Sequence, residues 1–177
     1  MPLPAEIDAP RIRLRRPIAS DAEVIFESYA RDPMVTRFLL WHPHSSVSVT
    51  HDFITSCIEA WDADTRRPYV ITQKPSSDAI GMIEARLHNS RVDLGYVLAR
   101  PHWGKGFMPE AIAAIATASL ALPRFFRVQA FCDTENIQSQ KALEKAGMRR
   151  EGRLERWVVH PNVSSEPRAC FMYARVK

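Results

Sequence analysis

The sequence predicts one α+β domain, because strand-like and helix-like segments alternate along a chain of ordinary domain size. Its 177 residues are 46% hydrophobic and 25% charged, a composition typical of a compact globular protein. Three successive strand-like segments lie in mid-chain, at residues 69–72, 80–87 and 92–98, with turn residues between them. Helical spacing of apolar residues precedes and follows them. We therefore expect antiparallel strands with helices packed against them.

The N-terminal part is expected to contribute a short strand. Charged and apolar residues alternate over 11–15, the period of a half-buried strand, and Pro17 ends the pattern. We expect a single domain over 1–177, in which residues 1–9 form a loose N-terminal segment.

Two helices are expected before the three central strands. Ser20 to Glu23 has the S-x-x-E pattern of a capping box, and the helix that it starts should end at Asp32 and Pro33. A second helix is expected from about Ser48 to Ala63, because apolar residues recur there at helical spacing.

The second half of the chain is expected to hold two more helices. Pro109 suits the first turn of a helix that ends before Pro123. Another helix should run from Asn136 to Ala146, with Gly147 where a left-handed C-terminal cap requires glycine. The strands expected in this half are 127–131, 154–159 and 169–176.

Composition excludes several classes of protein. The net charge of +4 comes from scattered basic residues, so we expect no nucleic-acid partner, although charge alone would allow one. Cys57, Cys132 and Cys170 form no C-x-x-C pair, so no metal site is expected, and such cysteines suit a cytoplasmic protein. No apolar run is long enough to span a membrane, and the N-terminus lacks a signal-peptide pattern, so no membrane partner is expected.

The segment from Trp103 to Met108 is the most informative about chemistry. A strand there leads through a glycine-containing turn into a helix, and the free N–H groups and dipole of a helix N-terminus suit a phosphate. Gly104 and Gly106 permit positive φ angles, and Lys105 adds a cation. A purely structural turn is the alternative. The spacing matches neither the P-loop nor the dinucleotide-binding pattern.

Three motifs in order resemble those of the GNAT N-acetyltransferase superfamily, in particular the branch around the ribosomal-protein N-terminal (Rim-type) acetyltransferases. They are DLGYVL at 93–98, WGKGFMPEA at 103–111, and NIQS followed by LEKAGM within 136–148. Looser similarity extends over nearly the whole chain. The resemblance implies a three-layer α+β fold whose mixed, mostly antiparallel sheet has helices on both faces. It also implies that this sheet splays open between the strands at about 92–98 and 127–131.

The resemblance implies an acetyl-CoA-dependent N-acetyltransferase that needs no metal. The acetyl group would move to a primary amine, of a protein N-terminus or a small molecule, by direct attack in a ternary complex. A non-catalytic acyl-CoA-binding regulatory module is the alternative. The sequence leaves the acceptor, the length of the acyl group and the oligomeric state open, a homodimer included.

The same resemblance places acetyl-CoA in the opening between the splayed strands. The pantetheine amides would pair with the strand at Tyr96 and Leu98, and Gly95 would form a bulge there. Asn136 and Ser139 would face the cofactor one helical turn apart, and Asn136 also suits a helix N-cap. The expected cofactor-binding residues are Tyr96, Val97, Leu98, Trp103, Gly104, Lys105, Gly106, Phe107, Met108, Asn136 and Ser139.

The reaction requires a polarised carbonyl, a proton acceptor for the amine and a proton donor for the thiolate. The resemblance implies that the backbone N–H of Tyr96 or Val97 polarises the carbonyl. Asp93 and Glu84 are the carboxylates expected toward the acceptor, although strand carboxylates are often structural.

The proton donor is where the chain departs from the family. Leu143 stands where many members carry a tyrosine that protonates the thiolate. Ser139 or a water molecule is the expected substitute, and Tyr173 is a weaker candidate.

Residues of two loops are expected to contact the acceptor. Trp41, His42 and His44 lie in the early loop that walls the acceptor site in this family, and His160 lies in a late loop. The acceptor-binding set is Trp41, His44, Glu84 and His160. Cys132 is expected near the thiol of the cofactor, more as a small core residue than as a nucleophile.

Overall fold

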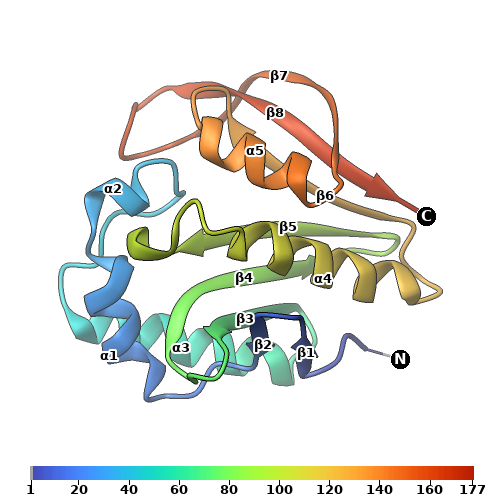
Figure 1. The fold of residues 1–177 in the computed structure, drawn as a ribbon. Coiled ribbons are helices and arrows are strands. Elements are labelled where there is room, and N and C mark those ends of the chain that lie inside the picture. Colours follow the sequence, from blue (N-terminus) through green and yellow to red (C-terminus); the bar gives the residue numbers. More distant parts are fainter. Residues whose placement is uncertain (1) are drawn as a thin grey trace.

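The computed structural model describes residues 2–177 and contains one eight-stranded sheet (Figure 1). Its strands lie in the order β1-β2-β3-β4-β5-β6-β8-β7. All neighbouring strands pair antiparallel except β5 and β6, which are parallel. The strands are β1 (Glu6–Asp8), β2 (Ile12–Arg15), β3 (Arg66–Gln73), β4 (Ala79–Leu87), β5 (Arg91–Leu98), β6 (Arg127–Asp133), β7 (Arg149–Val159) and β8 (Pro167–Val176). The expected mixed, mostly antiparallel sheet is confirmed.

Helices cover both faces of the sheet, as expected, and give the fold three layers (Figure 1). They are α1 (Asp21–Ile25), which continues as the π-helical turn η1 (Phe26–Ala30), α2 (Pro33–Thr36), α3 (Val47–Asp62), the 3₁₀ turn η2 (Arg100–His102), α4 (Phe107–Ala121) and α5 (Ile137–Lys145). One core cluster joins the sheet to α4, and a second joins it to α1 and α3. Among the described residues, no helix combines the length and apolarity needed to cross a membrane.

Strand alternation divides the central strands between these two cores. Ile83 of β4 and Leu94 of β5 pack in the cluster around α4, whereas Met82 packs in the cluster around α1 and α3.

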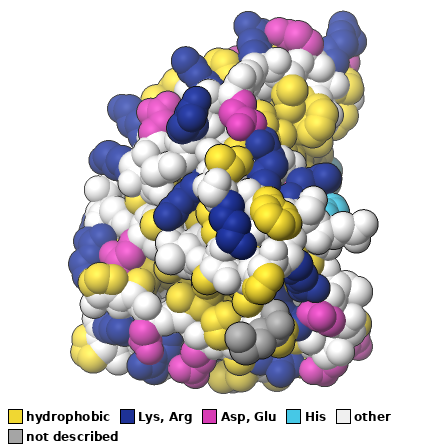
Figure 2. Space-filling view, turned by 90° about the vertical axis from the view of Figure 1, so that its right-hand side faces the viewer, with side chains coloured by type: hydrophobic (Ala, Val, Ile, Leu, Met, Phe, Trp, Pro, Cys, Tyr) yellow, Lys and Arg dark blue, Asp and Glu magenta, His cyan; other side chains and the backbone are white. Residues whose placement is uncertain are grey.

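On the face shown in Figure 2, basic side chains are interspersed with acidic and apolar ones.

The sheet splits between β5 and β6, which confirms the expected splay. The two strands pair only over Arg91–Asp93 and Arg127–Gln129. Beyond Asp93, β5 continues to Leu98 without a partner on that side, so its edge borders an opening inside the sheet.

The expectation of a loose N-terminal segment is wrong. Glu6–Asp8 pairs with β2 as an edge strand, Leu3 is buried, and the Tyr69 hydroxyl donates a 2.7 Å hydrogen bond to the carbonyl of Pro4. Three residues are too few for a periodic pattern in the sequence, so the pairing with β2 is what orders this strand.

The capping box is also wrong, although the helix does begin at Asp21. The Ser20 side chain makes no capping hydrogen bond. Instead the Asp21 carboxylate accepts from the backbone N–H of Ile18 at 2.8 Å and pairs with Arg15 at 2.6 Å.

Both ends of α5 match the sequence. The Asn136 side chain caps the N-terminus by accepting from the N–H of Ser139. At the other end Gly147 has φ +80°, and the N–H groups of Gly147 and Met148 bond to Glu144 and Leu143 in a Schellman motif.

The expected bulge at Gly95 is absent. The β4–β5 register is unbroken from the Gly81–Leu98 pair to the Leu87–Val92 pair. Gly95 has a different use: a Cβ at this position would collide with the guanidinium of Arg86, which lies over β5.

Candidate active site

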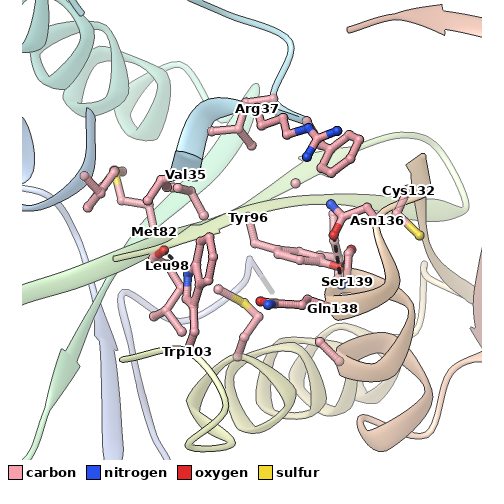
Figure 3. Close-up of a pocket in the computed structure, with 18 of the residues that line it drawn as sticks. Val35, Arg37, Met82, Tyr96, Leu98, Trp103, Cys132, Asn136, Gln138 and Ser139 are labelled. Atoms are coloured by element: carbon pink, nitrogen blue, oxygen red, sulfur yellow. Dashed lines mark hydrogen bonds between the residues drawn. The ribbon is translucent and has the colours of Figure 1, made fainter. Parts of the chain in front are cut away.

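A cavity of about 870 Å³ occupies the opening between β5 and β6 (Figure 3). Its lining comes from both cores: Leu98 and Met108 belong to the cluster around α4, and Met82 and Val97 to the cluster around α1 and α3. The cavity therefore passes through the sheet, so that two ligands could approach one reaction centre from opposite faces.

The open edge of β5 presents backbone groups to this cavity. The hydrogen bonds Ala99 N–H to Ile80 and His88 N–H to Arg91 fix which residues of β5 face β4. Because these directions alternate along an antiparallel pair, Val97 points its N–H toward β4, and Tyr96 and Leu98 point theirs toward the opening. The Val97 N–H is therefore turned away from the opening where a thioester would lie.

The glycine turn before α4 has the conformation expected for an anion-binding loop. Gly104 and Gly106 have φ +74° and +84°, and Gly106 is the N-cap of α4. Both glycines line the cavity, whereas Lys105 does not.

Arg11 braces this turn, and the sequence analysis missed it. Its guanidinium donates to the carbonyl of Lys105 at 2.9 Å and pairs with Glu110 at 2.8 Å. These partners lie 94 and 99 residues away, so no local pattern could connect them. Arg11 places a cation beside the turn where the sequence pattern expected only Lys105.

Two hydroxyl groups meet at the centre of the cavity lining. The Tyr96 and Ser139 oxygens are 2.6 Å apart, which links the open edge of β5 to the first turn of α5 (Figure 3). Burial raises the pKa of the Tyr96 phenol above its ordinary value of 10, so it carries its proton near neutral pH. Cys132 lies beside Ser139, and burial raises the pKa of its thiol to about 11.

The early and late loops form the side of the cavity where the acceptor is expected, called the acceptor side below. Asn162 fastens them together by donating to the carbonyls of Thr36 and Trp41, each at 2.8 Å. The sequence offered no pattern that singled out Asn162. His42 bonds to Asn162 and does not line the cavity.

His44 and His160 are the histidines that reach this side of the cavity. His44 bonds to the Thr50 hydroxyl at 2.8 Å, and His160 is 2% exposed, with Nε2 3.7 Å from an oxygen of Asp133. Burial lowers the pKa of both imidazoles, so both are neutral near pH 7.

Asp93 is misplaced for a general base. It does not line the cavity, because it lies where β5 still pairs with β6. Its carboxylate pairs with His88 at 3.0 Å and Arg91 at 3.2 Å.

Glu84 does line the cavity, but both of its oxygens are engaged, by Arg66 and Arg86. Neither oxygen is therefore free to bind the amine of an acceptor.

The tyrosine position of the family is closed as well. Leu143 is fully buried in the core around α4. Tyr173 is also buried and donates to Glu144 at 3.0 Å without lining the cavity.

The structure brings most of the predicted site residues together. Those that line the cavity are Trp41, His44, Glu84, Tyr96, Val97, Leu98, Trp103, Gly104, Gly106, Phe107, Met108, Asn136, Ser139 and His160. Asp93 and Lys105 lie outside it. Within residues 2–177, no three His, Cys, Asp or Glu side chains are arranged to hold a metal ion.

Comparison with known sequences agrees with this geometry. A family model described as an acetyltransferase (GNAT) domain matches residues 11–149. The uncharacterized N-acetyltransferase p20 of Bacillus licheniformis is 30% identical over 147 residues, which cover 81% of this chain and 82% of that protein. YoaA of Bacillus subtilis, also named an uncharacterized N-acetyltransferase, is 26% identical and covers 86% of this chain and 87% of its own.

Solved structures share the fold over nearly the whole chain. A GNAT-family acetyltransferase from Bacillus anthracis superimposes with a TM-score of 0.85 at 24% identity, covering 97% of this chain and 98% of its own. The microcin C7 self-immunity acetyltransferase MccE, in complex with acetyl-CoA and AMP, gives 0.85 at 19% identity, covering 96% and 94%. RimL, a ribosomal L7/L12 α-N-protein acetyltransferase in complex with coenzyme A, gives 0.84 at 17% identity, covering 98% and 97%.

Proposed function

Because the chain belongs to the GNAT acetyltransferase family, we propose that it transfers acetyl from acetyl-CoA to a primary amine by direct attack in a ternary complex. The observation that carries this proposal is the cavity through the sheet, which is lined by the glycine turn before α4 on one side and by the early and late loops on the other. It lets the amine and the thioester meet without a covalent enzyme intermediate.

The donor half of the site follows from the backbone. The pyrophosphate binds at the N-terminus of α4, where Gly104 and Gly106 leave N–H groups accessible and the helix dipole favours an anion. The pantetheine arm extends along β5 and pairs with the N–H of Leu98, as an added strand would, which leaves the N–H of Tyr96 for the thioester.

In the proposed reaction, Tyr96 acts on the thioester through its backbone N–H and through its side-chain hydroxyl. The amine nitrogen attacks the carbonyl carbon, and the Tyr96 N–H stabilises the negative charge that develops on oxygen. The C–S bond then breaks, and the thiolate takes a proton from the hydroxyl pair of Tyr96 and Ser139. This pair takes the role of the tyrosine that many family members carry at the position of Leu143.

The amine must lose one proton during the reaction. An α-amine has a pKa of about 7.7 to 8.0, so a useful fraction is neutral near pH 7 and a water molecule suffices as the proton acceptor. A lysine side chain, with a pKa of about 10.4, would need a stronger base than the cavity lining supplies. The proposed acceptor is therefore an α-amine or an amine of similar basicity.

Steady-state kinetics of three variants tests the assigned proton donor. We expect Tyr96→Phe and Ser139→Ala to lower kcat about 100-fold, since general acid catalysis is worth that much or more, with a small change in KM for acetyl-CoA. Tyr173→Phe is the matched control, because it removes a buried hydroxyl outside the cavity and should keep kcat. Loss of kcat in the control, with full activity in the other two, would contradict the assignment.

A further inference from the structure

We propose that the acceptor carries a carboxylate or phosphate close to its amine, which the arginines Arg37, Arg66 and Arg86 bind at the acceptor side of the cavity. This inference rests on the proposed function and narrows its substrate class. All three arginines line the cavity, and the carboxylate of Glu84 pairs with two of them, Arg66 and Arg86.

Arg66 and Arg86 form a cationic pair on adjacent strands. They lie directly opposite each other in the β3–β4 register, where like charges repel. Glu84 binds both, so it neutralises only one of the two charges. Arg66 is further held by the Ser56 hydroxyl at 3.1 Å. The cluster therefore keeps one positive charge in a partly buried place, where screening by solvent is weak.

Arg86 is the member whose guanidinium stays available. Its Nε donates to Glu84 at 2.8 Å, and within residues 2–177 its two terminal nitrogens make no hydrogen bond or ion pair. The missing side chain of Gly95 gives these nitrogens room over β5, next to Tyr96. Two free donors on a planar guanidinium match the two oxygens of a carboxylate or phosphate.

Arg37 approaches from the opposite wall. It follows α2, and Figure 3 shows its side chain extending over the cavity. The guanidinium lies 5.0 Å from the ring centroid of Phe38, and no carboxylate of the described chain pairs with it. Arg37 thus adds a second charge, which has no partner within residues 2–177.

The other two carboxylates of the lining cancel only one of these charges, because they share a further arginine. Asp133 and Glu135 both pair with Arg168, at 2.6 Å and 2.9 Å. The acceptor side therefore has a net positive charge, which disfavours polyamines and other polycations. An amine that brings its own anion supplies the missing partner for Arg37 and Arg86.

The test uses acceptors that share one α-amine and differ in the charge of the next side chain. Dipeptide amides Ala-Asp, Ala-Asn and Ala-Lys, and the phosphoserine analogue, are compared by kcat/KM for thiol release from acetyl-CoA. We expect Ala-Asp or the phosphoserine peptide to exceed Ala-Asn about tenfold, with Ala-Lys lowest, since hydrogen bonds to a charged group have that worth. The stronger of the two anionic acceptors tells whether carboxylate or phosphate is the natural group.

Variants connect the preference to the arginines. We expect Arg37→Glu to reverse it in favour of Ala-Lys, and Arg86→Gln to reduce it about tenfold. Arg31→Gln is the control, because Arg31 pairs with Glu27 outside the cavity and should keep the wild-type order. Thermal unfolding of each variant verifies that it is folded.

The outcomes separate this inference from the proposed function. Turnover of all peptides at equal rates, or a wild-type preference for Ala-Lys, would overturn the inference and leave the acetyltransferase intact. Binding of acetyl-CoA without turnover of any amine would overturn the proposed function and the inference with it.

Discussion

Tyr96 contributes to the site twice, through its backbone N–H and through its phenol. The N–H points into the gap because β5 loses β6 as a neighbour after Asp93, and the phenol is fixed by its 2.6 Å contact with Ser139. Cys132 lies next to this pair, but its thiol has a pKa of about 11 because it is buried. At the scale of residues, the described part of the site holds protonated groups near the position proposed for the thioester, and its cysteine is not an activated nucleophile.

Direct transfer of the acetyl group does not require the thiol of Cys132. We expect Cys132→Ala to keep kcat within about threefold of the wild type, because a buried neutral thiol is a weak nucleophile and direct attack does not use it. Initial velocities measured against both substrates should give intersecting lines. Parallel lines, an acetylated protein detected by mass spectrometry, and an inactive Cys132→Ala would together contradict direct transfer.

Residue-level prediction from sequence selected side chains that the fold brings together where a motif fixed the position. Gly104, Gly106, Asn136 and Ser139 were identified in this way, and all of them line the cavity. It failed for Asp93, because strand periodicity cannot tell the paired end of β5 from its open end.

The arginines of the acceptor side were also missed as a group. Arg66 and Arg86 meet only through the register of β3 and β4, which spacing along the chain does not reveal.

At the scale of elements, α4 and α5 present their N-termini to the cavity and β5 supplies the edge between them. Local rules predicted these helices well, since the N-cap of α5 and its Schellman motif involve only neighbouring residues. The S-x-x-E pattern at α1 failed because a carboxylate of the same segment, Asp21, pairs with Arg15 of β2. The strand β1 was not predicted, because its three residues form a strand only through pairing with β2.

The C-terminal cap of α5 gives a stability prediction. We expect Gly147→Ala to lower the free energy of unfolding by about 1 to 2 kcal/mol, since Gly147 has φ +80° and alanine is strained there. A Cβ at this position would touch nothing within 4 Å, so the loss is a backbone effect. Gly152→Ala is the control, because it is equally open and lacks the positive φ, and urea unfolding should show a much smaller change. Equal losses in both variants would contradict the interpretation.

Arg11 gives a prediction for the turn before α4. We expect Arg11→Gln to raise the Kd of coenzyme A about fivefold, because it removes both the brace on Lys105 and a cation beside the phosphates. Calorimetric titration measures this at low salt, where the difference should be largest. Arg13→Gln is the control, since Arg13 of β2 pairs with Asp8 of β1, and neither residue lines the cavity. An unchanged Kd for Arg11→Gln would show that the backbone alone holds the anion.

At the scale of the whole molecule, one sheet separates the face covered by α4 and α5, where we propose that the donor binds, from the face covered by α1 and α3, where we propose that the acceptor binds (Figure 1). The order of strands and helices followed from sequence patterns, but the split between β5 and β6 was inferred from the family resemblance. No periodicity of residues encodes this gap, because it depends on where the pairing of β5 with β6 stops, and these two strands lie far apart in the sequence.

One buried and two partly buried histidines predict how stability depends on pH. Burial lowers the pKa of His44, His102 and His160 below 6.5, so the unfolded chain binds more protons than the folded protein as the solution is acidified. Their contribution is complete above pH 6.5 or so and is lost as pH falls through that value and below, at up to about 1.4 kcal/mol per pH unit for each proton. Urea unfolding between about pH 7.5 and 5.5 should show this fall, and His160→Gln should make it shallower. A free energy of unfolding that stays constant or increases on acidification would be inconsistent with three neutral imidazole rings whose pKa values lie below 6.5.

The most direct test of the account is to measure, in one reaction, the thiol released from acetyl-CoA and the acetylated amine formed, with Ala-Asp amide as acceptor. If the cavity through the sheet joins donor and acceptor as argued, both products form in equal amounts and neither appears without the peptide. Tight binding of acetyl-CoA with no peptide-dependent thiol release would contradict the account and identify a protein that holds the cofactor without using it.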